Sequence, residues 1–258
     1  MLAGMSTPAG AGSPPATRRA RQRQAAVAEI KALARRQLAE HGTGAVSLRA
    51  IARQMGTASS ALYRYFASHD ELVGALCADA YDAVADAMAA ARDAVPDGEH
   101  ARRWRAVCDA YRRWSLGNPA DFALIFGTPV PGYRAPGQVT GPAASRFTAV
   151  PLDVFTAAVA AGAADPARTQ MPPDLPAGDL LQDLLGRSRL SHATHLAAIT
   201  VSAWASILGY LITEIFGSLP QLTTDPGRLW EAHLRTVMLG MGFDPAVVGS
   251  PPGQLADA

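Results

Sequence analysis

Apolar residues recur at helical spacing along nearly the whole chain, and the alternation typical of strands is almost absent. The sequence therefore predicts an all-α fold. The expected helices cover residues 21–40, 48–55, 59–66, 69–94, 99–116, 143–161, 190–216 and 226–241, with a shorter helical pattern over 118–127. Stretches rich in Pro and Gly at 128–141 and around 172–176 are expected to be loops.

The length and composition are those of a folded chain with an atypical start. Of the 258 residues, 49% are hydrophobic, so the chain can bury one large core and hold a smaller domain beside it. Residues 1–16 carry no charge and are mostly Gly, Pro, Ala, Ser and Thr, so we expect a disordered tail over 1–19. This tail lacks the features of a secretory signal, which makes the cytoplasm the expected compartment. Cys77 and Cys108 stand alone in helical patterns and are expected to be reduced and buried.

Charge is distributed unevenly along the chain. Residues 1–66 carry ten Arg and Lys side chains against two acidic ones, a net charge of +8, whereas residues 67–258 carry a net charge of −7. A basic end suits the phosphate backbone of DNA, and an acidic body would be repelled by it. Arginine residues that only keep helix surfaces solvated would give the same count, so charge alone does not decide the function.

Two short helices over residues 47–66 carry the strongest functional signal. A helix-turn-helix that reads DNA needs two helices that cross steeply through a tight turn. Ala52 is small where the helices must approach, and Gly56 can adopt the positive φ of the turn. The apolar contacts would come from Ile51, Met55 and Leu62. The second helix begins with short polar side chains followed by Tyr and Arg, which can reach base edges and phosphates.

The consecutive segments IKALARRQLAEHG, SLRAIARQMG and TASSALYRYFASHDEL resemble the first helices of the TetR family of transcriptional regulators. The resemblance implies a three-helix helix-turn-helix domain at 20–68, a helical effector-binding and dimerisation domain at 69–243, and a frayed tail at 244–258. It implies a regulator, expected to be a repressor, that binds a palindromic operator in double-stranded DNA as a homodimer and is released by a small-molecule effector. The residues expected to contact DNA are Ser47, Arg49, Thr57, Ser59, Ser60, Tyr63, Arg64, Tyr65 and His69.

Several positions leave alternatives open. Ala58 stands where the family usually has Ser or Thr, so Thr57 or Ser59 is expected to cap the recognition helix. His69 replaces a common Lys, which would make that phosphate contact weaker or dependent on pH. Tyr63 could instead pack partly against the first helix and leave only its hydroxyl near DNA. An arm that enters the minor groove and a merely solvated tail are both open for Arg18, Arg19, Arg21 and Arg23.

A single helix-turn-helix makes few contacts, so such proteins usually form dimers that read two half-sites. The dimer interface is expected in the two C-terminal helices, 190–216 and 226–241. Residues 196–213 are 18 consecutive uncharged positions, nearly the length of a membrane span. Because Thr and Ser interrupt the run, a helix buried in the body and against a second copy explains it better, and no membrane contact is expected.

Six aromatic residues of the body are candidates for an apolar effector pocket, although aromatic side chains at helical spacing also form ordinary core. They are Trp104, Tyr111, Trp114, Phe122, Phe126 and Trp204. His192 and His195 lie three positions apart, but no third ligand at fixed spacing supports a metal site, so neither a metal nor a cofactor is expected. No catalytic motif is recognisable. A helical enzyme and an adaptor that binds only protein are the alternatives to a regulator.

Overall fold

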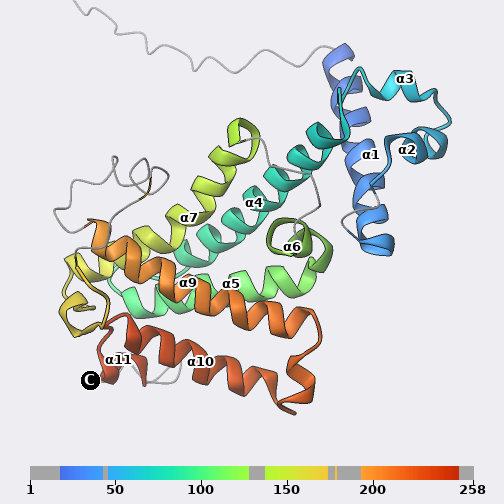
Figure 1. The fold of residues 1–258 in the computed structure, drawn as a ribbon. Helices are drawn as coiled ribbons and strands as arrows, with labels where there is room; N and C mark the ends of the chain where they lie inside the picture. The colour runs from blue at the N-terminus through green and yellow to red at the C-terminus, as the bar shows by residue number, and fades with distance from the viewer. Residues whose placement is uncertain (1–17, 43–45, 128–136, 174–177, 179–192, 250–258) are drawn as a thin grey trace, which may run out of the picture.

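Helices make up the described part of the chain, as predicted (Figure 1). The structure is a computed structural model that describes residues 18–42, 46–127, 137–173, 178 and 193–249. The long helices are α1 (Arg18–His41), α4 (His69–Asp93), α5 (His100–Gly117), α7 (Gly137–Ala160), α9 (Ala193–Ile215) and α10 (Pro226–Gly240). The short ones are α2 (Leu48–Gln54), α3 (Ser59–Leu62), α6 (Pro119–Phe126), α11 (Pro245–Val248) and the 3-10 helices η2 (Pro166–Arg168) and η3 (Leu219–Gln221).

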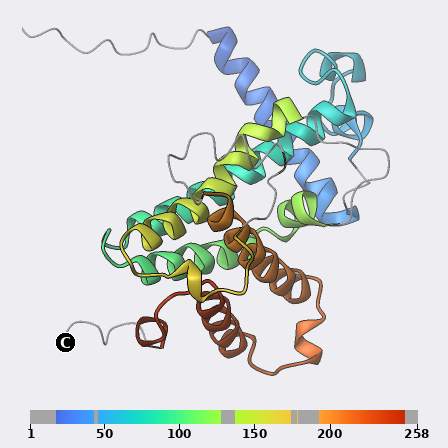
Figure 2. The same ribbon diagram turned by 60° about the vertical axis from the view of Figure 1, so that its left-hand side comes forward.

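Helices α1, α2 and α3 form a small domain at one end of the molecule, opposite α10 (Figures 1 and 2). Its buried core includes Ile30 of α1, Ile51 of α2 and Leu62 of α3. The first turns of α4 add Leu72 and Leu76 to the same core. The boundary expected between residues 68 and 69 therefore separates α4 from a core that its own first turns help to form.

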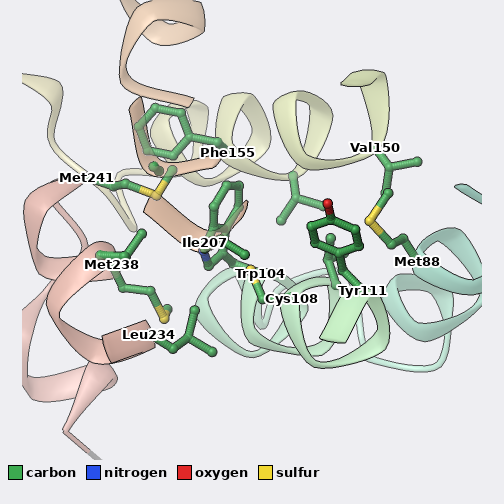
Figure 3. Close-up of a cluster of buried hydrophobic side chains, with 14 of the residues drawn as sticks. Met88, Trp104, Cys108, Tyr111, Val150, Phe155, Ile207, Leu234, Met238 and Met241 are labelled. Atoms are coloured by element: carbon green, nitrogen blue, oxygen red, sulfur yellow. The ribbon is translucent and has the colours of Figure 1, made fainter. Parts of the chain in front are cut away.

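The remaining helices pack around a second, larger core (Figure 3). In this body α4 and α7 lie side by side, and α9 packs against α5, α7 and α10. The side chains of Trp104, Tyr111 and Phe155 are fully buried in the centre. Each large apolar side chain removed from water contributes about 1.5–3 kcal/mol. Cys77 and Cys108 are free and buried, as expected.

Helix α7 begins earlier than the sequence predicted, at Gly137 instead of residue 143. The predicted loop over 128–141 therefore ends sooner, although residues 128–136 lie outside the described residues. Pro142 and Pro151 lie inside the helix, where each removes a backbone hydrogen bond. The helix forms despite them because Phe147 and Phe155 are buried against the body, and tertiary packing outweighs local preference.

Both ends of the described chain are more ordered than the sequence suggested. Helix α1 already includes Arg18 and Arg19, which were assigned to the disordered tail; residues 1–17 lie outside the described residues. The C-terminal tail, expected to fray from residue 244, begins with α11. The carboxylate of Asp244 accepts a hydrogen bond from the Ala246 amide at 2.9 Å, and Val248 is only 4% exposed. A cap and one apolar contact thus hold this turn on the body.

The long apolar helix α9 is a helix of the body. Residues Thr194–Ile215 have a mean hydropathy of 1.7 and are the one stretch of the described chain long and apolar enough to cross a membrane. Because this helix packs against three others, its composition is explained by burial, as expected. Near its start, Nε2 of His195 lies 2.9 Å from the carbonyl oxygen of Met171, whereas His192 lies outside the described residues.

Candidate nucleic-acid interface

Helices α2 and α3 meet through a turn of the kind that a helix-turn-helix requires. Ser47 caps α2, because its hydroxyl accepts a hydrogen bond from the Ala50 amide at 3.3 Å. Gly56 has a φ of +63°, in the left-handed region that glycine adopts without strain. The Thr57 amide then donates to the carbonyl of Ala52 at 3.0 Å and closes the turn. Backbone geometry therefore sets the direction in which α3 leaves α2.

The recognition helix α3 differs from the prediction in its cap and its length. Its N-cap is Ala58, with no side-chain hydrogen bond, so the expectation that Thr57 or Ser59 would cap it was wrong. Regular helix ends at residue 62 instead of 66, although the Phe66 amide still donates to the Leu62 carbonyl at 3.0 Å. So short a helix is unstable alone. Burial of Leu62, which is 1% exposed, holds it against α1 and α2.

The nine residues expected to contact DNA lie on α2, α3 and the turns around them. Four are exposed: Arg49, Ser60, Tyr63 and Arg64. Five are half-buried: Ser47, Thr57, Ser59, Tyr65 and His69. The side chain of Tyr63 is 48% exposed, so it is not packed away against α1. Tyr63 and Arg64 are therefore open to a molecule that approaches α3.

Helix α4 begins with the capping box predicted from Ser68 and Glu71. The Ser68 hydroxyl accepts a hydrogen bond from the Glu71 amide at 3.1 Å, and the Glu71 carboxylate accepts one from the Ala67 amide at 2.5 Å. His69 follows the cap, and its Nδ1 lies 3.2 Å from a carboxylate oxygen of Asp70. His69 thus already has an acidic neighbour where the family has a lysine facing phosphate.

Most basic side chains of the helix-turn-helix end have no acid to pair with. Within the described ranges no ion pair is formed by Arg18, Arg19, Arg21, Arg23, Arg36, Arg49, Arg53 or Arg64. Arginines of the body that do pair with acids are Arg92, Arg102, Arg103, Arg105, Arg112 and Arg146. The positive charge seen in the sequence is therefore uncompensated at this surface, which favours a polyanion such as DNA.

Comparison with known proteins agrees with this geometry over both parts of the chain. Residues 30–76 match the family described as bacterial regulatory proteins, tetR family, and residues 104–237 match the tetracyclin repressor-like C-terminal domain. The HTH-type transcriptional regulators Mb1846 of Mycobacterium bovis and Rv1816 of Mycobacterium tuberculosis are each 35% identical over 212 residues, which cover 82% of this chain and 90% of theirs. The chain belongs to the TetR family of transcriptional regulators.

Solved structures show the same fold for this TetR-family chain. The crystal structure of SCO4313 is 34% identical and has a TM-score of 0.66, covering 86% of this chain and 99% of that one. A bacterial regulatory protein in the tetR family from Rhodococcus RHA1 is 17% identical with a TM-score of 0.56, covering 85% and 98%, and supports the fold alone. The expected arrangement, an N-terminal helix-turn-helix followed by a helical body, is confirmed.

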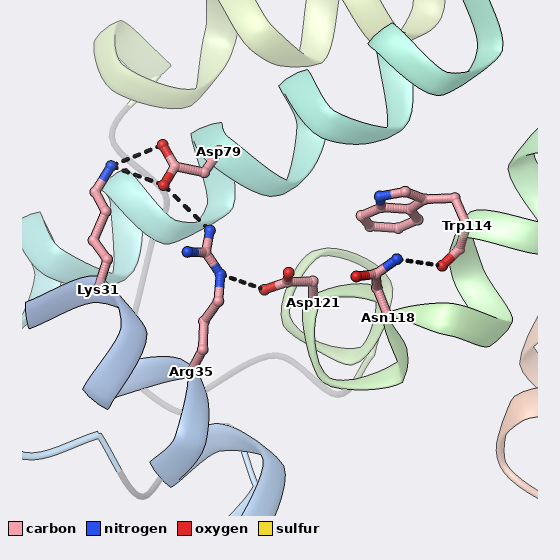
Figure 4. A network of polar contacts seen from close by, with 6 residues as sticks. All are labelled: Lys31, Arg35, Asp79, Trp114, Asn118 and Asp121. Atoms are coloured by element: carbon pink, nitrogen blue, oxygen red, sulfur yellow. Dashed lines mark hydrogen bonds and ion pairs between the residues drawn. The ribbon is translucent and has the colours of Figure 1, made fainter. Parts of the chain in front are cut away.

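In this TetR-family regulator, four charged side chains join the helix-turn-helix domain to the body (Figure 4). Lys31 Nζ lies 2.7 and 2.8 Å from the two carboxylate oxygens of Asp79 on α4. Arg35 donates to Asp79 and to Asp121 of α6, both at 3.2 Å. Sequence reasoning missed this network because the partners lie 44 to 86 positions apart and only the fold brings them together.

The structure brings four of the six predicted pocket residues together in one aromatic cluster: Tyr111, Phe122, Phe126 and Trp204, joined by Phe147 of α7. Tyr111 stacks on Trp204 with ring centroids 4.8 Å apart and 14° between the planes. Phe147, which sequence reasoning missed, lies 5.5 Å from Phe126. These rings come from α5, α6, α7 and α9, so the cluster links α6 to the centre of the body.

The other two predicted pocket residues lie outside the aromatic cluster. Trp104 packs with Phe155 and Phe243, each at a centroid distance of 6.3 Å. Trp114 is half-buried, and its carbonyl accepts a hydrogen bond from the side-chain amide of Asn118 at 2.8 Å (Figure 4). Aromatic residues at helical spacing thus serve two separate parts of the core, which spacing alone did not distinguish.

Three buried polar atoms at this cluster have no hydrogen-bond partner within the described part of the chain: Tyr111 Oη, Ser115 Oγ and Trp204 Nε1. Tyr111 and Ser115 are 0% exposed and lie one turn apart on α5. Burial raises the pKa of the Tyr111 hydroxyl well above its ordinary value, so the group stays protonated and able to donate. Leaving such a group unpaired costs about 1–3 kcal/mol, which a polar ligand would recover.

An uncharged face runs along α9 and α10 at the end of the body away from α3 (Figure 1). Its exposed residues on α9 are Val201, Ser202, Ala205, Ser206 and Gly209, and those on α10 are Leu229, Ala232, Thr236 and Gly240. A hollow of about 380 Å³ opens between the two helices and is lined by residues of both, among them Ser206 and Thr236. The two stripes therefore belong to one continuous surface.

Proposed function

We propose that this TetR-family regulator is a cytoplasmic repressor that binds a palindromic operator as a homodimer and is released from it by a small-molecule effector. The observation that carries the proposal is the exposure of Tyr63 and Arg64 on α3, at an end of the molecule whose arginines have no acidic partners. Such an end attracts the DNA backbone, and α3 is short enough to lie in the major groove with Ser59 and Ser60 towards the bases.

The uncharged face of α9 and α10 supports dimerisation. Val201 is 52% exposed and Leu229 is 39% exposed, although both are apolar. A second copy that packed α9 and α10 against the same helices would cover this face as a four-helix interface. Because the operator half-sites lie about 34–36 Å apart or at multiples of that distance, such a dimer would hold two recognition helices at a matching separation.

The aromatic cluster supports an effector that is largely apolar and carries at least one hydrogen-bonding group. The rings would surround the apolar part, and the unpartnered hydroxyl of Tyr111 would meet the polar part. Phe122 and Phe126 of α6 lie in the cluster, while Asp121 of α6 pairs with Arg35 of α1. A ligand that favoured another position of α6 would therefore favour another position of the helix-turn-helix, as a population shift requires.

The proposal is tested by selecting bound fragments of the genome. Purified protein is incubated at low ionic strength with sheared DNA from its source organism, and the retained fragments are sequenced beside a selection without protein. We expect a few fragments to be enriched and to share an inverted repeat. An adaptor that binds only protein, or an enzyme without an operator, would enrich none, and that result would overturn the proposal.

A further inference from the structure

Helix α1 begins well before the stretch that matches the TetR family's DNA-binding domain. That match starts at residue 30, whereas α1 starts at Arg18. The segment 18–24 contains four arginines, and the first acid of the helix is Glu29. These residues form regular helix, exposed or half-buried. The basic start of the chain is therefore a rigid extension of the helix-turn-helix domain, about 10 Å long at 1.5 Å per residue.

This extension lies against the end of the recognition segment. Nη1 of Arg23 donates to the carbonyl oxygen of Arg64 at 3.4 Å. The Arg23 guanidinium also lies 5.5 Å from the ring centroid of Tyr65, within the range of a cation–π contact. Through these two contacts α1 and the residues directly after α3 hold each other in place.

A hollow of about 530 Å³ opens between the two elements. It is lined by Arg19, Ala20, Gln22, Arg23, Arg64 and Tyr65, and we call it the arginine cleft. None of its three arginines forms an ion pair with another residue in the described ranges. Arginine presents a planar set of donors that matches the oxygens of a phosphate group. The cleft thus combines concave shape, uncompensated positive charge and suitable donors.

We propose that the arginine cleft receives a backbone phosphate of the DNA on which α3 is seated. The inference rests on the proposed function. Arg64 belongs both to the cleft and to the residues expected to contact DNA, so one DNA backbone passing α3 reaches the cleft without leaving the surface. A phosphate contact carries no sequence information. The cleft therefore adds affinity and fixes the orientation of α3, whereas the bases are read by the residues at the start of α3.

The test compares two double variants that remove the same charge from the same turns of α1. Arg19→Ala with Arg23→Ala removes the α1 side of the cleft, and Arg18→Ala with Arg21→Ala removes two neighbouring arginines that do not line it. Kd for a duplex carrying the selected operator, and for a random duplex of equal length, is measured by fluorescence anisotropy over a series of salt concentrations. Thermal unfolding checks that both variants stay folded.

We expect the cleft variant to bind both duplexes about tenfold more weakly, and the slope of log Kobs against log salt to shrink by about 2 per dimer, one phosphate for each protomer. The control variant should stay near the wild type in both measurements. If the two variants lose affinity equally, or the cleft variant loses none, the cleft inference fails while operator binding stands. If the wild type itself binds no duplex, the proposed function fails.

Discussion

Single residues act at this site mainly through the backbone. Gly56 holds the turn between α2 and α3 at a φ of +63°, and a Cβ added there would meet nothing within 4 Å. A larger residue would therefore be disfavoured by the backbone conformation alone and not by a clash. Because that conformation aims α3, strain at Gly56 should affect DNA binding as well as stability.

Replacing Gly56 by Ala should lower the free energy of unfolding by about 1 kcal/mol, the usual cost of a left-handed conformation for a residue with a Cβ. The measurement is urea unfolding followed by circular dichroism. Gly98→Ala is the matched control, because Gly98 is equally open and has no positive φ. The explanation would be wrong if the two substitutions had the same effect.

Residue-scale features were predictable where the signal was local. Ser47 and Ser68 cap α2 and α4 as their spacing indicated, since a cap depends on residues within one turn. The cap of α3 was not predictable in this way, because Ala58 offers no side-chain acceptor and α3 is held by the distant core around Leu62 instead.

At the scale of elements, α6 stands between the two parts of the molecule. Ala120 and Leu124 pack against the core of the helix-turn-helix domain, while Phe122 and Phe126 face the aromatic cluster. Asp121 adds the ion pair to Arg35 of α1. Helical periodicity predicted that α6 exists, but its partners could not be predicted because they lie on α1, which is far away in the sequence.

A double-mutant cycle should detect the contact between α1 and α6. Arg35→Ala, Asp121→Ala and the double variant are expected to give a coupling free energy of about 1 kcal/mol, near the upper end for ion pairs, because the Asp121 side chain is only 16% exposed. The same cycle on Arg102 and Glu99, an exposed pair within α5 and its cap, should give less than about 0.5 kcal/mol. Zero coupling between Arg35 and Asp121 would show that this ion pair does not join the domains.

At the scale of the whole molecule, the two ends have different surfaces. One end carries arginines without acidic partners, and the far end carries the uncharged face of α9 and α10. The charge asymmetry predicted the first end from the sequence alone. The second end was predicted only as a run of uncharged residues, because which of them stay exposed depends on how α9 packs on α5 and α7.

A charge placed in the uncharged face should prevent dimerisation. Ala205 is exposed on α9, and Ala205→Asp would bury a carboxylate without a partner in the proposed interface. Sedimentation should give the wild type twice the chain mass of 26.9 kDa and give this variant 26.9 kDa. Ala90→Asp, on the exposed side of α4, serves as the control and should remain a dimer. A dimeric Ala205→Asp variant would place the interface elsewhere.

Operator binding through α3 is tested most directly by the affinity of a variant in which Tyr63→Ala and Arg64→Ala are combined. Kd for the selected operator duplex is measured by fluorescence anisotropy at fixed salt, beside Arg113→Ala, an exposed arginine of α5 that forms no ion pair in the described ranges. We predict that the double variant binds roughly a hundredfold or more weakly, at about 1–3 kcal/mol per lost contact in each protomer, while its circular dichroism spectrum and the affinity of the control stay unchanged. An affinity within twofold of the wild type would show that DNA does not bind at α3.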